Sequence, residues 1–213
     1  TWAQYAVADA GACMPVSEHI PDEQAAGMIV NPFTAYALVE QAEKSGSKAI
    51  VIDAAASQLA GMMRAIAKQK SLRTINIVRE DEQIKQLKFE DADYVLNMRD
   101  DDFYSQLYEI THKEEVYTAV DAVSGSLTGI LVNAMPPASE VIVYGSLSES
   151  AVNNIDPRDL IYHQKSIRGF ALGKWFREKS QQETGKILQY LQEMMVAGEI
   201  KYQVQHKVAL DRM

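Results

Sequence analysis

Apolar and polar positions alternate in blocks along most of the chain. Short apolar runs, rich in β-branched residues, recur at regular intervals and predict strands at 48–53, 73–78, 93–97, 117–122, 140–145 and 166–171. Segments with helical spacing of apolar residues separate them and predict helices at 57–70, 80–89, 101–113, 126–135 and 178–197. The run 49–52 is apolar at every position, which is typical of a parallel strand buried on both faces. The pattern predicts an α/β fold whose parallel sheet has helices on both faces.

The unit from Lys48 to Arg79 is the most informative part of this pattern. It reads as a strand, a turn of small residues, a helix and a second strand. The turn lies where a glycine-rich phosphate loop would lie, at the N-terminus of a helix, whose backbone N–H groups and dipole favour an anion. Four of its residues are the candidate contacts to a pyrophosphate: Ala55, Ala56, Ser57 and Gln58. The fingerprint glycines are missing, and Ser57 has a second interpretation as an ordinary N-cap, which shares the geometry of an anion site.

A doubly wound (Rossmann-type) sheet with strand order 3-2-1-4-5-6 follows from the repeated strand–helix units. We expect residues 1–213 to form a single nucleotide-binding domain. Ahead of the first strand, residues 22–44 have helical periodicity with a break at Asn31-Pro32. The segments 1–20 and 200–213 have no local partner, and we expect them to lead to a catalytic domain that the chain does not contain.

Composition restricts the classes of partner. The formal net charge of −8 argues against nucleic acid, since a phosphate backbone requires a basic surface. No apolar run approaches the roughly 20 residues that span a bilayer, and residues 1–4 do not resemble a signal peptide. One cysteine, Cys13, and four dispersed histidines predict neither a disulfide nor a zinc site. We therefore expect a cytoplasmic protein without a membrane or nucleic-acid partner.

Several short motifs together resemble the medium-chain dehydrogenase/reductase superfamily. Its Asn-Pro-x-Thr-Ala-Tyr motif matches Asn31-Pro32-Phe33-Thr34-Ala35-Tyr36, and its first strand, phosphate loop and helix match residues 50–68. Its loop after the fifth strand resembles Tyr144-Gly145-Ser146-Leu147, and its sixth strand resembles Ile167-Arg168-Gly169-Phe170. The likeness covers essentially the whole chain. It is strongest to the zinc-independent quinone oxidoreductase and 2-enoyl thioester reductase branch.

This resemblance implies a cofactor, a reaction and a set of contacts. It implies an NADP-binding (NADPH-binding) domain of an enzyme that reduces a quinone or an enone or enoyl group by hydride transfer. It places the nicotinamide near Asn31 and Thr34, and adds Val123, Tyr144, Gly145 and Phe170 to the cofactor-binding residues. No catalytic residue and no metal ligand is assigned, and the isolated domain is expected to be inactive. The alternative is a non-catalytic Rossmann scaffold or engineered interaction module with a degenerate phosphate loop.

The end of the second strand is the position that selects between NAD and NADP. An acidic residue there binds the 2′-hydroxyl of NAD, whereas an arginine accommodates the 2′-phosphate of NADP. Arg79 occupies it and favours NADP, although the adjacent Glu80 weakens a positive field, and a solvated arginine at a helix start is the ordinary alternative. Asp121, after the fourth strand, is interpreted as a structural acceptor near the cofactor rather than a catalytic acid.

The sixth strand lies at an edge of the predicted sheet. An exposed apolar edge favours pairing, and relatives of this type dimerise there. We predict a homodimer through strand 166–172, which would also cover Trp175 or Phe176. The opposite edge, with Phe89 and Met98, is the competing contact.

Overall fold

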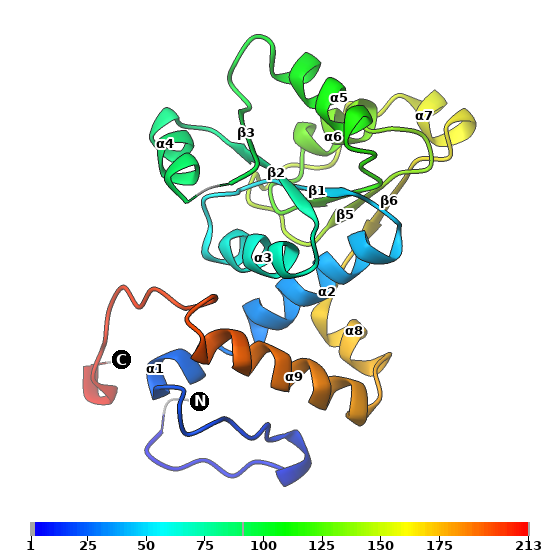
Figure 1. Cartoon of the computed structure of the whole chain (residues 1–213). Helices are drawn as coiled ribbons and strands as arrows, with labels where there is room; N and C mark the ends of the chain where they lie inside the picture. Colours follow the sequence, from blue (N-terminus) through cyan, green and yellow to red (C-terminus); the bar gives the residue numbers. More distant parts are fainter. Residues whose placement is uncertain (1–2, 91, 213) are drawn as a thin grey trace.

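The computed structural model describes residues 3–90 and 92–212, and it is built around one six-stranded sheet (Figure 1). All neighbouring strands are parallel and their order is β3-β2-β1-β4-β5-β6, so the predicted fold class and strand order are confirmed. The strands are β1 (Ala49–Ile52), β2 (Arg73–Val78), β3 (Tyr94–Asn97), β4 (Thr118–Asp121), β5 (Glu140–Val143) and β6 (Ser166–Gly169).

Helices cover both faces of this sheet. On one face α2 (Val30–Lys44) and α3 (Gln58–Gln69) pack against each other and against Ile50 and Ile52 of β1. On the other face α5 (Phe103–Lys113) and α6 (Ser126–Ala134) pack against Ala49 and Val51. β1 therefore has a core on each side, which explains why it is apolar at every position. The remaining helices are α1 (Asp22–Ala25), α4 (Asp81–Phe89), α7 (Pro157–Tyr162), α8 (Leu172–Arg177) and α9 (Gln181–Val196), with two 3-10 turns, η1 (Ala10–Ala12) and η2 (Leu210–Arg212).

The helices α8 and α9 pack on the outer side of α2 and form a further layer below the sheet in Figure 1. Trp175 of α8 is buried and lies against Phe33 of α2, with ring centroids 6.3 Å apart, and Phe176 lies 5.0 Å from the same ring. The expectation that a dimer would cover Trp175 is therefore wrong, because this side chain is buried within the chain. Phe176 is half-buried against the same helix.

Some predicted boundaries differ from the structure for physical reasons. The break at Asn31-Pro32 is wrong, because Pro32 lies in the first turn of α2, where its missing N–H has no helical partner to lose. The predicted helix 178–197 begins later, at Gln181, because Ser180 and Glu183 form a capping box. α7 and α8 were not predicted, and β5 and β6 end two residues earlier than expected. Gly198, with φ +73°, follows the end of α9 as a glycine stop.

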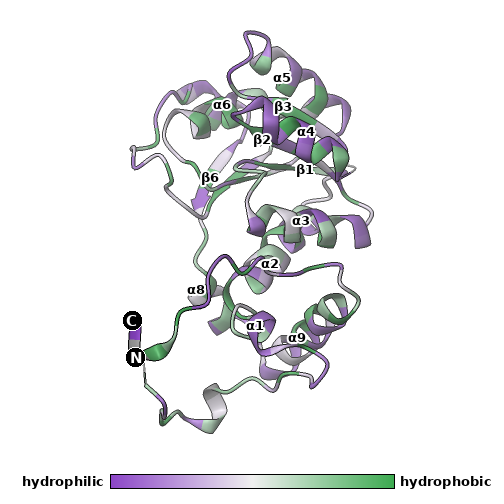
Figure 2. Cartoon of the chain, turned by 90° about the vertical axis from the view of Figure 1, so that its left-hand side faces the viewer, coloured by the Kyte–Doolittle hydropathy of each residue, from purple (hydrophilic) through white to green (hydrophobic). Residues whose placement is uncertain are grey.

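The edge strand β6 differs from the buried centre of the sheet. Its residues are exposed or half-buried, and Figure 2 draws it in hydrophilic and neutral colours. In the terminal segments, residues 1, 2 and 213 lie outside the described part of the chain, and the rest is largely irregular. Within residues 3–90 and 92–212, no helix is both long and apolar enough to cross a membrane.

Candidate functional site

The residues that the sequence singled out follow the carboxyl ends of the strands or begin α2. In an open parallel sheet, this edge is where ligands bind, at the point where the strand order reverses. Here the reversal lies between β1 and β4. The β1–α3 loop holds Ala55, Ala56 and Ser57, and Gln58 begins α3. The loops after β2, β4, β5 and β6 hold Arg79, Val123, Tyr144-Gly145 and Phe170.

The β1–α3 loop (residues 53–57) presents unpaired backbone donors. Ser57 caps α3 by accepting the Ala60 N–H at 3.2 Å, as the capping interpretation predicted. Ala54 has φ +43°, and the buried Ala55 donates its N–H to Ile77 at the end of β2. Across the described residues, no acceptor faces the backbone N–H groups of Ala56, Gln58 and Leu59. The loop therefore offers three donors at a helix N-terminus, the arrangement that binds phosphate groups.

Gln58 points away from these donors. Its amide donates to the Gln203 carbonyl at 3.1 Å and accepts the Gln203 N–H at 3.2 Å. Gln24 of α1 holds Tyr202 in the same reciprocal way, at 2.9 and 2.6 Å. We call residues 201–205 the strap, because these two glutamines fix it between α1 and the start of α3. In this conformation both polar groups of the Gln58 side chain are bonded to the strap.

The strap also reaches the start of α2. The Tyr202 ring lies over Gly27, where an added Cβ would come within 2.5 Å of the ring. The Asn31 backbone hydrogen bonds to the Tyr202 hydroxyl and lowers its pKa, although burial has the larger effect and raises it. Thr34 lies one turn further along α2 and is buried. The strap therefore joins the Asn31–Thr34 region to the phosphate-loop region.

The β4–α6 loop (residues 122–125) is built differently, around two buried carboxyl groups. Asp53 accepts the N–H groups of Ala122 at 2.7 Å and Val123 at 3.1 Å. Asp121 accepts the Ser124 N–H at 2.6 Å and the Thr128 hydroxyl at 2.5 Å. Both aspartates are fully buried, which agrees with the structural interpretation of Asp121. The backbone N–H groups of Ala122, Val123 and Ser124 are therefore already used by the protein.

Burial perturbs the titration of this cluster. It raises the pKa of Asp53 well above its ordinary value, and the adjacent Asp121 raises it further by hydrogen bonding and by charge. Burial also raises the pKa of Tyr144, and both aspartates add to the effect. The Tyr144 hydroxyl is buried without a hydrogen-bond partner among the described residues. Two carboxylates this close cannot both ionise cheaply, which adds to the effect of burial on the pKa of Asp53.

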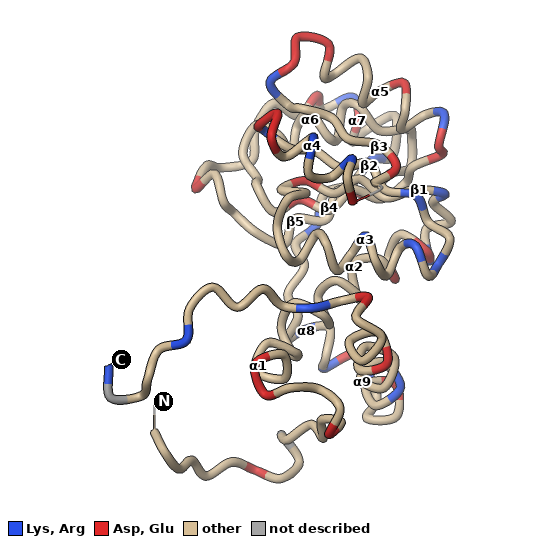
Figure 3. The backbone as a smooth tube through the Cα atoms, turned by 60° about the vertical axis from the view of Figure 1, so that its left-hand side comes forward, with Lys and Arg blue, Asp and Glu red and all other residues tan. Residues whose placement is uncertain are grey.

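Two arginine residues, Arg79 and Arg99, belong to the region around the end of β2. Arg79 is exposed, and its backbone N–H donates to Gln83 at 3.1 Å. Glu80 forms an ion pair with Arg99, at 2.7 Å, so its charge is balanced rather than directed at Arg79. Figure 3 shows acidic residues in the loop that leads into α5, and Asp81 and Glu82 lie in the first turn of α4. The expected weakening of the positive field by Glu80 is thus offset by Arg99.

The remaining candidates surround the β4–α6 loop and α2. Gly145 lies tightly against Ala122, where an added Cβ would be 2.8 Å from its carbonyl oxygen. Phe170 is half-buried and packs in the same core as Phe33 and Tyr144. These contacts bring Val123, Tyr144 and Gly145 together. Arg79 lies on the other side of β1, after β2.

Two hollows flank the molecule. One, of about 710 Å³, lies between α3, the end of α4 and the strap, and reaches Ala56, Ser57 and Gln58. The other, of about 900 Å³, lies between residues 11–19 and α9. Over the described parts of the chain, no three histidine, cysteine or acidic side chains are grouped where they could hold a metal ion.

Three features of the site were not recognised in the sequence. Asp53 could have been paired with Asp121 from the strand order, since both residues follow neighbouring strands. Arg99 follows β3, and β3 is the neighbour in the sheet of β2, which Arg79 follows. Arg64 donates to the Ala55 carbonyl at 2.6 Å, and no local pattern signals that contact.

Comparison with known proteins gives consistent similarities. A family model described as zinc-binding dehydrogenase matches residues 59–192. The mitochondrial enoyl-[acyl-carrier-protein] reductase of Arabidopsis thaliana is 24% identical over 223 residues, which cover 100% of this chain and 59% of that protein. A crystal structure of a putative NADPH:quinone reductase from Mesorhizobium loti is 38% identical, with a TM-score of 0.83, and the match covers 90% of this chain and 55% of the other.

A more distant solved structure has the same fold. The 2-enoyl thioester reductase Etr1p/Etr2p heterodimer of Candida tropicalis is 18% identical with a TM-score of 0.75, over 86% of this chain and 53% of that one. A complex of Etr1p with NADP and crotonyl-CoA matches with a TM-score of 0.74. The chain spans between half and three-fifths of the length of these proteins.

Proposed function

Since the chain belongs to the medium-chain dehydrogenase/reductase superfamily and covers the nucleotide-binding part of its zinc-independent quinone oxidoreductase and enoyl thioester reductase branch, we propose that it binds NADPH along the carboxyl edge of its sheet. The pyrophosphate lies on the β1–α3 loop, the adenosine end extends toward Arg79, and the nicotinamide end extends toward Asn31 and Thr34. Val123, Tyr144, Gly145 and Phe170 line the intervening side.

The observation that carries this proposal is the set of unpaired N–H groups at the start of α3. Three backbone donors and the Ser57 cap stand at the reversal point of the strand order. A phosphate there receives hydrogen bonds and the favourable end of the helix dipole. The residues present therefore fit a dinucleotide although the fingerprint glycines are absent.

Arg79 supports NADP rather than NAD. It is exposed at the end of β2, and the ion pair with Arg99 compensates the adjacent Glu80, although Asp81 and Glu82 follow at the start of α4. A guanidinium pairs with a phosphate through charge-assisted hydrogen bonds that a ribose hydroxyl cannot match. The relative bound to NADP is consistent with this choice.

The bound cofactor would supply a hydride to an electron-poor carbon–carbon double bond or a quinone. This chain contributes the binding and orientation of the cofactor. Since it spans only about half of its relatives, we expect it to be a poor catalyst alone, with one side of the cleft open to water.

Titration of NADPH fluorescence, with NADH in parallel, tests the proposal. Arg79→Ala should weaken NADPH about tenfold and leave NADH within about twofold, because only NADPH has the 2′-phosphate. Lys88→Ala, which removes an exposed cation from α4, controls for a general loss of charge. Equal losses for both cofactors would exclude Arg79 as the selector. Absence of binding at millimolar NADPH would favour a non-catalytic scaffold.

The homodimer is proposed to form through β6. Alternation along the strand directs the Phe170 N–H to β5, and therefore the Gly169 N–H outward to the open edge. Gly169→Pro removes that donor, whereas Gly169→Ala keeps it, and nothing lies within 4 Å of an added Cβ. Light scattering should show a dimer for the wild type and Gly169→Ala but a monomer for Gly169→Pro. A dimer in all three would favour the Phe89 edge, where Phe89 is 93% exposed.

A further inference from the structure

Arg64 reaches from the second turn of α3 back into the β1–α3 loop. Side chains on a helix lean toward its N-terminus, which brings the guanidinium beside Ala55. One terminal nitrogen donates to the Ala55 carbonyl at 2.6 Å, and the other to Glu90, just after α4, also at 2.6 Å. The side chain is 13% exposed. Burial lowers the pKa of Arg64, and its pairing with Glu90 opposes that shift.

This contact determines which way the peptide group between Ala55 and Ala56 faces. In a trans peptide the C=O and the N–H point in opposite directions. Because Arg64 holds the Ala55 carbonyl inward, the Ala56 N–H is turned outward. The Ala55 N–H is fixed independently by the Ile77 carbonyl of β2.

The same contact keeps a second donor unpaired. The Ala55 carbonyl stands four residues before Leu59, so it is the acceptor that the Leu59 N–H would take if α3 began two residues earlier. Arg64 occupies that carbonyl, and Leu59 makes no such bond. Arg64 and the extended backbone of the Ser57 cap, with ψ 158°, together keep the helix from extending into the loop and using a donor that the ligand needs.

We propose that Arg64 is a positioning residue for the phosphate loop, which orients the Ala56 and Leu59 N–H groups toward a pyrophosphate in place of the missing glycines. The inference rests on the proposed NADPH site and adds a residue that does not touch the ligand. Glu90 holds the guanidinium in place from the far side. Glu90 balances the charge of Arg64, so Arg64 acts more through its hydrogen bond to the Ala55 carbonyl than through its charge.

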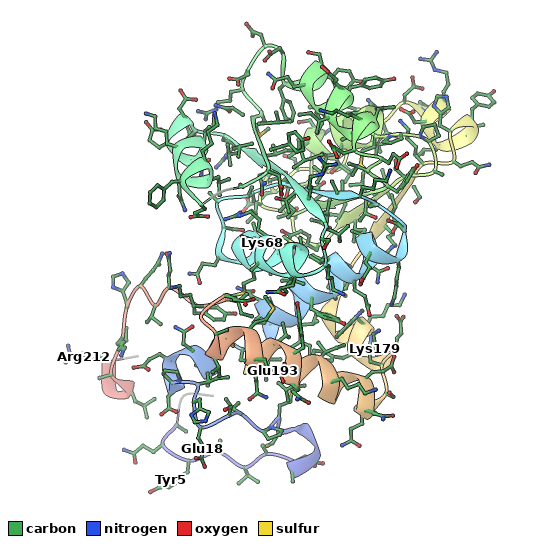
Figure 4. The ribbon with its side chains drawn as sticks, in the orientation of Figure 1. Tyr5, Glu18, Lys68, Lys179, Glu193 and Arg212 are labelled. Carbon is green, nitrogen blue, oxygen red and sulfur yellow. The ribbon has the colours of Figure 1, made fainter. Side chains whose placement is uncertain are left out.

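The chain offers a matched control on the same helix. Lys68 lies one turn further along α3, is exposed, and lines the same 710 Å³ hollow (Figure 4). Lys68→Met and Arg64→Met each remove one positive charge and leave an unbranched side chain. Arg64→Lys retains the charge but cannot bond Ala55 and Glu90 at the same time.

The first measurement is backbone amide exchange without cofactor, in protein that circular dichroism shows to be folded. In Arg64→Met, we expect exchange at Leu59 to slow about fivefold as its N–H bonds the freed Ala55 carbonyl. Lys68→Met should leave it unchanged. Unaltered exchange and unaltered Ala56 and Leu59 amide resonances in Arg64→Met would overturn the inference.

The second measurement is the NADPH dissociation constant. Arg64→Met should raise it about tenfold, Arg64→Lys less, and Lys68→Met by less than about twofold. An unchanged constant in Arg64→Met, with a wild type that binds, would also overturn the inference. Failure of the wild type to bind contradicts the proposed function instead, and the exchange experiment then still decides what Arg64 does to the loop.

Discussion

The loops after β1 and β4 have similar backbones but differ in whether the protein itself accepts their N–H groups. Each follows a strand that leads into a buried aspartate, and each contains a non-glycine residue with positive φ, Ala54 at +43° and Ser124 at +67°. In the β4–α6 loop, the two aspartates accept three consecutive backbone N–H groups. In the β1–α3 loop, the N–H groups of Ala56, Gln58 and Leu59 find no acceptor within the described structure. The protein's own carboxylates thus take the N–H groups of residues 122–124, whereas the N–H groups of Ala56, Gln58 and Leu59 are left for a ligand.

The β4–α6 loop should matter most for stability. Asp121→Ala leaves the Ser124 N–H and the Thr128 hydroxyl buried without partners and should lower the free energy of unfolding by about 3 kcal/mol. Ser57→Ala in the β1–α3 loop removes only a cap and should cost about 1 kcal/mol. Urea denaturation measures both. Equal losses would remove the structural distinction between the loops.

The carboxyl groups that hold the β4–α6 loop should also give the protein a specific pH dependence. The folded-state pKa of Asp53 is raised, so the folded protein keeps a proton that the unfolded chain releases above its ordinary pKa. The contribution of this group is therefore complete below about pH 4 and is lost as pH rises through the folded pKa. An asparagine does not ionise, so Asp53→Asn should not lose stability in this way as pH rises. The free energy of unfolding of the variant minus that of the wild type should therefore increase between pH 4.5 and 8.5.

Asp156→Asn is the control for that profile. The Arg158 side chain holds the pKa of Asp156 at about 2, so this exposed carboxylate stays ionised over the same range. Its replacement should give an offset that does not change with pH. If the difference in unfolding free energy between Asp53→Asn and the wild type were also independent of pH, the buried pair would not titrate on unfolding.

A smaller effect is expected where the β1–α3 loop meets the strap. Gln58→Ala and Gln24→Ala each remove two hydrogen bonds to the strap backbone, at partly exposed positions. Trypsin should cleave after Lys201 about fivefold faster in either variant, because the strap detaches more often. Gln189→Ala on α9, whose amide bonds only Glu193, is the matched control. Unchanged cleavage would show that the glutamines do not hold the strap.

The sequence was sufficient for features that depend on local pattern and topology. The continuous apolar run of β1 and the Ser57 cap were each predicted from residues that are neighbours in the chain. Strand order followed from the strand–helix alternation. The Ser180–Glu183 capping box was also readable, and overlooking it placed the start of the predicted helix 178–197 three residues too early.

Features that depend on contacts between distant residues were not predictable. Arg64 reads as an ordinary polar position on α3, and only the fold brings it to Ala55 and Glu90. Gln58 is separated by 145 residues from the Gln203 backbone that it holds. Trp175 was expected at a dimer contact because its burial against Phe33 has no signal in either segment alone.

The division between the two loops is tested most directly by amide resonances during an NADPH titration of the whole chain. The largest saturable shifts should occur at Ala56, Gln58 and Leu59, whose N–H groups would donate to the phosphates. The shifts at Ala122 and Ser124, whose N–H groups already donate to carboxylates, should be smaller. The largest shifts at residues 122–124, or no shift in either loop at millimolar NADPH, would contradict the account.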